Sequence, residues 1–131
     1  MKPELEEKMM RKYPKIFRQK DLSPQETCMC WGISTGDGWY NLIDNLCGKI
    51  QRHVDGNNID QVEAMQVKEK FGGLRFYIDH GTEEIYNMIY EAENESYETC
   101  EYCGSQDNVH QTKGGWIVTL CDECEEKRNE K

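Results

Sequence analysis

The sequence contains no apolar run that approaches the length of a membrane span, and residues 1–20 alternate charges without the apolar segment of a signal peptide. Proline is scarce, with 3 residues in 131, and no stretch rich in proline, glycine and serine marks a flexible linker. We therefore expect a cytoplasmic protein with one main domain and no membrane association.

Histidine is also scarce, and the patterns of known catalytic sites are missing. None of the three histidines, His53, His80 and His110, lies at metal-ligand spacing from another or in a nucleophile motif. Asp79 next to His80 would support acid-base chemistry only if a cleft formed around the two side chains. We therefore expect that the protein is not an enzyme.

An excess of basic residues, the usual mark of a nucleic-acid-binding domain, is absent. The formal net charge is −9, and residues 1–79 hold 12 basic and 12 acidic residues, whereas residues 80–131 hold 4 and 13. The C-terminal part should therefore repel nucleic acid and attract basic protein surfaces. Direct binding of nucleic acid is accordingly not expected.

Cysteine is plentiful, and four of the seven cysteines form two C-x-x-C pairs, Cys100 with Cys103 and Cys121 with Cys124. Seventeen residues separate the pairs, which is a spacing typical of zinc sites. Two disulfides or free thiols are the alternatives, but an odd total of cysteines argues against an oxidised, secreted scaffold. Because four thiolates leave no open coordination position, we expect one Zn2+ with a structural role.

The residues around the two pairs predict how the metal lobe is built. Gly104 directly follows the first pair, where a knuckle turn commonly needs a residue that adopts positive φ. The apolar and β-branched run 116–120 reads as a strand that delivers Cys121 to the metal, and residues 125–131 read as a charged tail. This order is that of a zinc ribbon or a treble-clef-like module.

Three further cysteines, Cys28, Cys30 and Cys47, lie outside the two pairs. A second metal site would need a fourth ligand, and the sequence marks none. We prefer the interpretation that these cysteines are small buried thiols, and the sequence leaves a second metal site open as the alternative.

Hydrophobic periodicity predicts an α+β fold in which short helices pack on a small antiparallel β-hairpin, followed by a zinc-ribbon-like lobe with four cysteine ligands. Apolar residues recur at three- and four-residue spacing in the clearest helix, over residues 38–54, for which Asp37 is a plausible N-cap. A second helix is expected over residues 82–97 with Thr82 as its N-cap, and a shorter one at the start of the chain.

Two strands are expected over residues 62–69 and 74–79, joined by a turn at Phe71, Gly72 and Gly73. The sequence thus divides into an α+β core domain, residues 1–97, and a metal lobe, residues 98–131. We expect the protein to be a monomer.

Three segments, residues 38–44, 66–77 and 114–124, together resemble small phage and prophage proteins that carry a C-terminal four-cysteine zinc module. The resemblance covers most of the chain. Phage zinc-binding proteins of this size include anti-CRISPR inhibitors of the type II RNA-guided nuclease. The resemblance implies zinc ligation by Cys100, Cys103, Cys121 and Cys124.

By analogy with those inhibitors, we expect a phage-type protein that docks an acidic surface on a basic, nucleic-acid-handling surface of a host protein, such as the type II CRISPR effector nuclease. Occlusion would then block engagement of the guide or of the target DNA. Long-range attraction would speed the encounter, and a few buried aromatic anchors would supply most of the affinity. The candidate contacts are Glu91, Glu93, Glu95, Tyr97 and Glu98.

The alternative is a nucleic-acid-binding zinc ribbon that acts as a transcription modulator. It would use the basic residues between Lys8 and Lys20, together with Lys68, Lys70 and Arg75. The last three flank the Gly-Gly turn, which could hold an anion although it lacks the longer P-loop pattern. The net charge of the chain makes this alternative the less favoured one.

Overall fold

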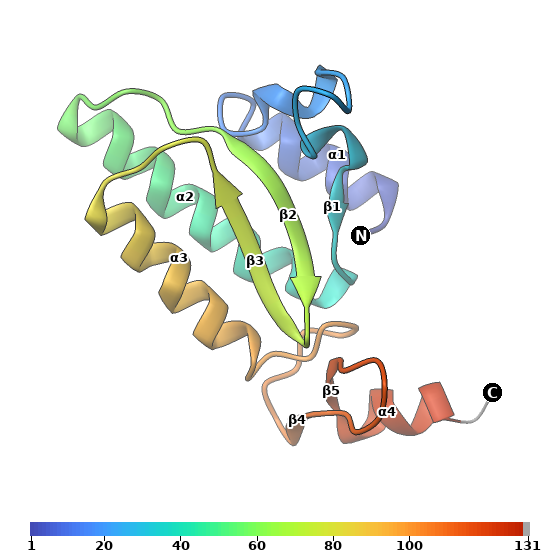
Figure 1. The fold of residues 1–131 in the computed structure, drawn as a ribbon. Coiled ribbons are helices and arrows are strands. Elements are labelled where there is room, and N and C mark those ends of the chain that lie inside the picture. Colours follow the sequence, from blue (N-terminus) through green and yellow to red (C-terminus); the bar gives the residue numbers. More distant parts are fainter. Residues whose placement is uncertain (130–131) are drawn as a thin grey trace.

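The computed structural model of the chain describes residues 1–129, and Figure 1 shows the arrangement of its elements. The fold is α+β, as the sequence predicts. The helices are α1 (Pro3–Lys12), α2 (Tyr40–Asn57), α3 (Glu83–Ser96) and α4 (Asp122–Asn129). The strands are β1 (Ile33–Ser34), β2 (Ala64–Lys70), β3 (Gly73–Ile78), β4 (Val109–Gln111) and β5 (Thr119–Cys121).

The main sheet has the strand order β1-β2-β3. The antiparallel hairpin of β2 and β3 pairs Val67 with Phe76, and both side chains are buried against the helices. The two-residue strand β1 pairs in parallel with β2, Ile33 opposite Val67. The hairpin confirms the prediction, whereas β1 is too short to produce a periodic signal in the sequence.

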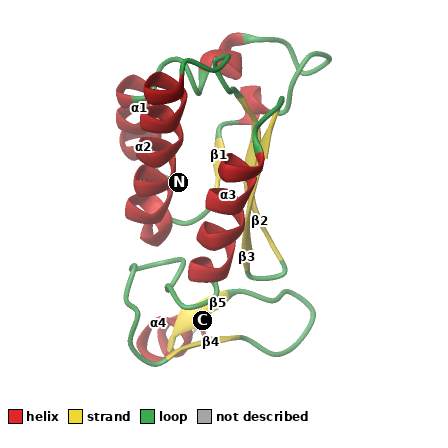
Figure 2. Ribbon diagram, turned by 90° about the vertical axis from the view of Figure 1, so that its left-hand side faces the viewer, coloured by secondary structure: helices red, strands yellow, loops and turns green. Residues whose placement is uncertain are grey.

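Helices α1, α2 and α3 lie on one side of this sheet, as Figure 2 shows. Their apolar stripes and the inner face of the hairpin form one core, in which Trp39, Ile43, Val67, Phe76 and Ile85 are buried. Lys68 and Arg75, the next cross-strand pair, start from the opposite face of the sheet because side chains alternate along a strand. The Arg75 guanidinium reaches back to Glu93 of α3, 3.1 Å away.

The helix boundaries partly match the predictions. Thr82 caps α3 as expected, since its side chain accepts a hydrogen bond from the Ile85 N–H. Asp37 does not cap α2: a 3₁₀ turn, Asp37–Trp39, precedes the helix, and the Asp37 carboxylate accepts the Lys2 N–H instead. Within residues 1–129, no helix combines the length and apolar character that a membrane crossing requires.

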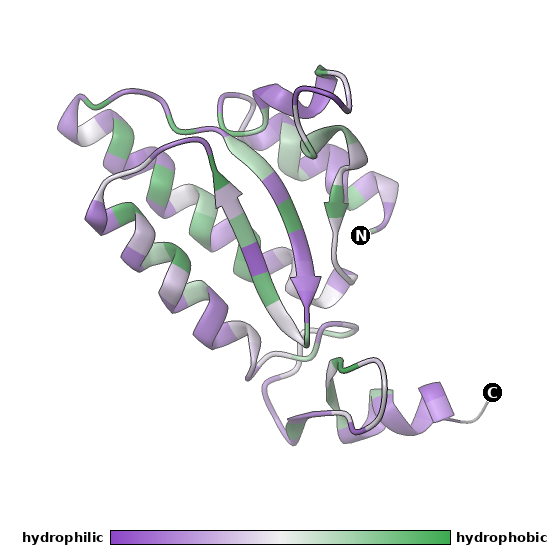
Figure 3. Ribbon diagram, in the orientation of Figure 1, coloured by the Kyte–Doolittle hydropathy of each residue, from purple (hydrophilic) through white to green (hydrophobic). Residues whose placement is uncertain are grey.

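The second lobe contains the β4–β5 hairpin and α4, and it has a small core of its own around Cys100, Val118 and Leu120. The predicted strand over residues 116–120 is wrong at its start, because β5 begins at Thr119 and Trp116 lies in the preceding loop. Residues 122–129 form α4 rather than a tail, and residues 130–131 of that predicted tail lie outside the described part of the chain. Figure 3 shows α4 as almost entirely hydrophilic.

Candidate metal centre

The first half-site is a tight turn that follows α3. The Gly104 N–H donates to the Cys100 carbonyl at 2.9 Å, and the Cys100 N–H donates to the Ser105 carbonyl at 2.8 Å. Gly104 has φ +82°, a conformation that residues with a side chain rarely adopt. The turn therefore depends on this glycine, as the sequence predicts, and it brings Cys103 back beside Cys100.

The second half-site joins a strand to a helix. Cys121 is the last residue of β5 and pairs with Val109 of β4, while Cys124 lies in the first turn of α4. The Asp122 N–H donates to the Asn108 carbonyl at 3.1 Å, which holds the start of the helix against the hairpin. The order is knuckle, hairpin and helix with the second pair at the helix start, which is the arrangement of the treble-clef-like alternative for this four-cysteine lobe.

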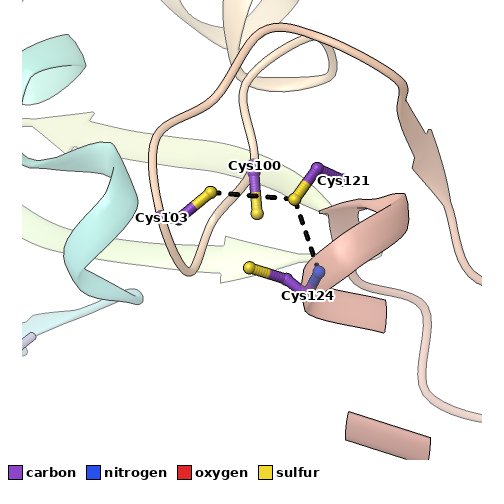
Figure 4. A group of neighbouring side chains, drawn as sticks. All are labelled: Cys100, Cys103, Cys121 and Cys124. Atoms are coloured by element: carbon purple, nitrogen blue, oxygen red, sulfur yellow. Dashed lines mark hydrogen bonds between the residues drawn. The ribbon is translucent and has the colours of Figure 1, made fainter. Parts of the chain in front are cut away.

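Figure 4 shows the four sulfurs converging on one point between the two half-sites. The four Sγ atoms all lie within 4.8 Å of one another, and those of Cys103 and Cys121 are 3.7 Å apart. A tetrahedral ion with bonds of about 2.3 Å to sulfur requires sulfur separations of about 3.8 Å. A disulfide needs about 2.05 Å, so the geometry fits a metal site and not a pair of disulfides.

The backbone around the site favours a thiolate. Burial raises the pKa of the Cys100 thiol, but hydrogen bonds from backbone N–H groups, those of Cys103 and Cys121 foremost, outweigh it and bring the pKa to about 7. Burial and the neighbouring sulfurs raise the pKa of Cys124. A bound metal cation would lower the free-energy cost of ionising these thiols, because its positive charge compensates the thiolate charges.

Four cysteine ligands close a tetrahedral sphere and leave no position for water or a substrate. A site of this composition suits Zn2+ or iron, which prefer sulfur donors in a tetrahedron. An ion bound here would cross-link the knuckle to the hairpin and the helix. Within residues 1–129, no other cluster of three or more side chains of metal-ligating type lies close enough to hold an ion.

The metal lobe is joined to the core through backbone contacts at the knuckle. The Gly38 N–H donates to the Glu101 carbonyl at 2.8 Å, and the Gly36 N–H donates to the Glu101 carboxylate at 2.8 Å. Trp39, buried in the core, donates its indole N–H to the Thr99 carbonyl at 2.9 Å. The residues that present the first ligands are therefore part of the same packed structure as the start of α2.

Glu101 lies between the two knuckle cysteines and is almost fully buried. Burial and the nearby Glu69 carboxylate raise its pKa, and the hydrogen bond from Gly36 opposes this shift. The Glu101 N–H donates to the Thr119 carbonyl at 2.9 Å. A single residue thus connects the core to both the knuckle and β5, and nothing in the spacing of the cysteines indicated this role.

The three remaining cysteines are placed differently from one another. Cys47 is fully buried in α2, and burial raises the pKa of its thiol. Cys28 is exposed, and Cys30 is partly exposed. The interpretation as small buried thiols is therefore right for Cys47 and wrong for Cys28.

The three histidines contact neighbouring groups of the described residues in different elements. The His53 ring lies 3.2 Å from the Asn57 side chain, four residues later in the sequence. The Asp79 carboxylate accepts hydrogen bonds from the Glu63 and His80 N–H groups, so it fixes the end of the hairpin.

His110 of β4 lies between two carboxylates of α4. Its Nε2 is 2.6 Å from Glu125 and its Nδ1 is 3.1 Å from Asp122. The hydrogen bond to Glu125 is the main reason that the pKa of His110 is raised above its ordinary value. The imidazole, when protonated, therefore ties the hairpin to the helix that carries Cys124.

We predict that this tie weakens as the pH rises. A raised pKa in the folded state means that the His110 contribution to stability is fully present below the unfolded-state pKa of about 6.5 and is lost as the pH rises through the higher folded-state value. The loss should be small because the imidazole is partly exposed. Proton NMR titration of the imidazole should give a pKa above 6.5. The melting temperature should fall as the pH rises through that pKa, and His110→Gln should remove this pH dependence. A pKa at or below 6.5 would contradict the prediction.

The predicted partner contacts lie on and just after α3. Glu91, Glu95 and Glu98 are exposed. Glu93 pairs with Arg75 at 3.1 Å, and the Tyr97 hydroxyl lies 3.5 Å from the same guanidinium group. Arg75 therefore holds two of the five predicted contacts within the fold and leaves three directed at solvent.

Comparison of the chain with protein-family models, with curated proteins and with solved structures finds no match. The conclusions about this site therefore stand on its own geometry. The coarse features that the geometry supports are a four-cysteine metal site and a treble-clef lobe fixed to an α+β core.

Proposed function

We propose that the four-cysteine site holds one structural Zn2+ and that the protein is a non-enzymatic binding protein. The exposed side of α3 docks on a basic surface of a protein that handles nucleic acid. We call this surface the acidic helix face and define it by the exposed residues Glu83, Tyr86, Asn87, Tyr90, Glu91, Asn94, Glu95 and Glu98.

Two exposed tyrosines are the observation that carries the proposal. Tyr86 and Tyr90 are 50% and 62% exposed, and they lie four residues apart on one side of α3. Tyrosine is enriched at the centres of protein interfaces because its ring supplies contact area and its hydroxyl supplies a hydrogen bond. Sequence reasoning missed both residues, although their four-residue spacing opposite the apolar stripe was a usable signal.

The charge of α3 is also unexplained by folding alone. The helix contains five glutamates and neither lysine nor arginine. Glu91, Glu93 and Glu95 lie near its C-terminal end, where the helix dipole disfavours negative charge by roughly 0.3–1 kcal/mol per residue. Only Glu93 has a cationic partner among the described residues. An acidic surface maintained at a cost in stability suits recognition of a basic partner.

The partner class follows from this complementarity and from the resemblance to phage proteins. A type II RNA-guided nuclease holds its guide and target in positively charged channels, so an acidic ligand could occlude such a channel. The proposed action is inhibition of target engagement in the cytoplasm of a bacterial host. The metal lobe fixes the chain that follows α3, and this preserves the shape of the acidic helix face.

Binding and inhibition should be measured with purified protein whose zinc content has been counted by atomic emission. We expect one zinc per chain, salt-sensitive binding to a type II RNA-guided nuclease and a slower cleavage of target DNA. Tyr90→Ala and the double variant Glu91→Lys with Glu95→Lys should each weaken binding at least tenfold. Glu4→Lys, which changes an exposed acid on α1, is the matched control and should bind normally.

Three results would overturn the proposal. Unchanged affinity of the α3 variants would show that the acidic helix face is not the docking surface. Affinity independent of salt would show that charge attraction does not drive binding. Unimpaired cleavage, together with the absence of any basic nucleic-acid-handling protein among the chain's binding partners, would exclude the partner class.

A further inference from the structure

A second surface, on the open side of the hairpin, combines exposed aromatic rings with lysines. Phe71 at the tip of the β2–β3 hairpin is 66% exposed, and Trp116 in the β4–β5 loop is 68% exposed. Both line one cleft of about 220 Å3, which we call the aromatic cleft. Its lining residues are Lys68, Glu69, Lys70, Phe71, Gly115, Trp116 and Ile117.

Phe71 occupies a backbone conformation that does not suit it. Phe71 has φ +53° and Gly72 has φ +84°, and positive φ at both central residues is the pattern of a type I′ hairpin turn. Asn-Gly is the favoured sequence for such a turn, and a bulky residue with positive φ is an outlier. Since Phe71 does not gain burial in return, the strain points to a role at the surface.

Trp116 is held in place although its side chain is exposed. The β4–β5 loop is closed by the Thr112 N–H, which donates to the Val118 carbonyl at 2.9 Å, and by the Val118 N–H, which donates to the Thr112 hydroxyl at 2.9 Å. The Thr119 hydroxyl donates to the Gly72 carbonyl at 2.6 Å. The two aromatic residues come from different lobes, and this bond fixes their loops side by side.

The charge at the aromatic cleft differs from that of the whole chain. Lys68 and Lys70 line the cleft, and Lys113 lies three residues before Trp116; none of the three pairs with a carboxylate in the part of the chain that the structure describes. Glu69 is the acidic residue in the lining, and its Oε2 is buried. A protein of net charge −9 thus presents a locally cationic surface around two aromatic rings.

We propose that the aromatic cleft binds single-stranded nucleic acid, with bases stacked on Phe71 and Trp116 and phosphates paired with Lys68, Lys70 and Lys113. A single strand exposes base faces that stack on aromatic rings in a sequence-tolerant way, while lysines neutralise its backbone. A duplex hides those faces and would lose the stacking contribution. The inference is independent of the acidic helix face, because it uses other residues on other elements.

The test is fluorescence anisotropy with labelled 15-nucleotide dT and rU oligonucleotides at low salt. We expect saturable binding that quenches Trp116 emission. Trp116→Ala and Phe71→Asn should each weaken it about 5- to 150-fold, which corresponds to the roughly 1–3 kcal/mol contributed by one stacked base. Lys70→Gln should make the logarithmic salt dependence shallower by about 0.7, the value for one phosphate contact on a single strand.

Two controls keep the result interpretable. Trp31→Ala removes a tryptophan that is 69% exposed outside the aromatic cleft, and it should leave affinity unchanged. Phe71→Asn should fold as well as the natural chain or better, because Asn-Gly suits the turn, so a loss of binding cannot be attributed to unfolding.

The proposal is overturned by any of three outcomes. The first is no saturable binding to either oligonucleotide at low salt. The second is unchanged affinity of Phe71→Asn and Trp116→Ala. The third is equal affinity for a duplex of the same length, which would show that base stacking is not used. If these two variants instead lose a protein partner while oligonucleotides bind nowhere, the cleft is a protein-docking site and the nucleic-acid assignment is wrong.

Discussion

Removal of the metal is expected to unfold the treble-clef lobe and to lower the stability of the α+β core with it. The core meets the knuckle through the hydrogen bonds that Gly36, Gly38 and Trp39 donate to residues 99–101, so these groups lose their partners when the knuckle opens. Structural zinc supplies about 10–16 kcal/mol of apparent binding energy in small zinc modules, and we expect a loss on the order of 5 kcal/mol here.

This prediction can be checked by thermal unfolding with and without a chelator under reducing conditions. The buried Trp39 lies at the junction and reports on it by fluorescence. Cys100→Ser should reproduce the effect of the chelator, whereas Cys28→Ser, at an exposed position outside the site, should change stability by no more than about 0.5 kcal/mol. An unchanged melting temperature after zinc removal would show that the metal does not support the core.

Gly38→Ala should be among the most damaging single substitutions that leave all four metal ligands in place. A Cβ atom at Gly38 would lie 2.3 Å from the Cys100 carbonyl oxygen, 2.5 Å from the Gly104 nitrogen and 2.7 Å from the Glu101 carbonyl oxygen. These are backbone atoms of the knuckle, which cannot move aside as a flexible side chain can. We expect a loss of about 3 kcal/mol, or about 10 °C in melting temperature, and weaker metal affinity.

Gly56→Ala is the matched control for this substitution. Gly56 lies near the end of α2, and a Cβ atom there meets nothing within 4 Å. Alanine is the better helix former, so the variant should be as stable as the natural chain or up to about 1 kcal/mol more stable. Competition with a chromophoric zinc chelator would compare the metal affinities. Equal affinity and stability of the two variants would mean that the core does not constrain the knuckle.

The comparison of sequence and structure is clearest at the metal centre. The spacing of Cys100, Cys103, Cys121 and Cys124 was enough to predict that these four side chains gather at one point, because two C-x-x-C pairs are a local and chemically specific pattern. The same pattern did not distinguish a ribbon from a treble clef. The difference between the two lobe types lies in α4. This helix buries no side chain, so its sequence has no apolar stripe from which a helix could be predicted.

The main helices and the β2–β3 hairpin were also predictable, because apolar residues recur in each of them at the period of a helix or a strand. Strand β1 was not, because two residues carry no period and its pairing with β2 joins segments more than thirty residues apart. Asp37 was assigned as a cap from its position before an apolar run, but it begins a 3₁₀ turn, Asp37–Trp39, and α2 starts only after that turn.

The sequence by itself therefore determined the α+β class, the hairpin and the cluster of four cysteines, which are encoded in short-range spacing and periodicity. Only the tertiary structure decided how the knuckle packs on Gly36 and Gly38, and that Phe71 and Trp116 lie beside one cleft. Those relationships join residues 45 or more positions apart, and their distances depend on how helices, sheet and lobe pack together. The local preferences of residues for helix, strand or turn do not predict that packing.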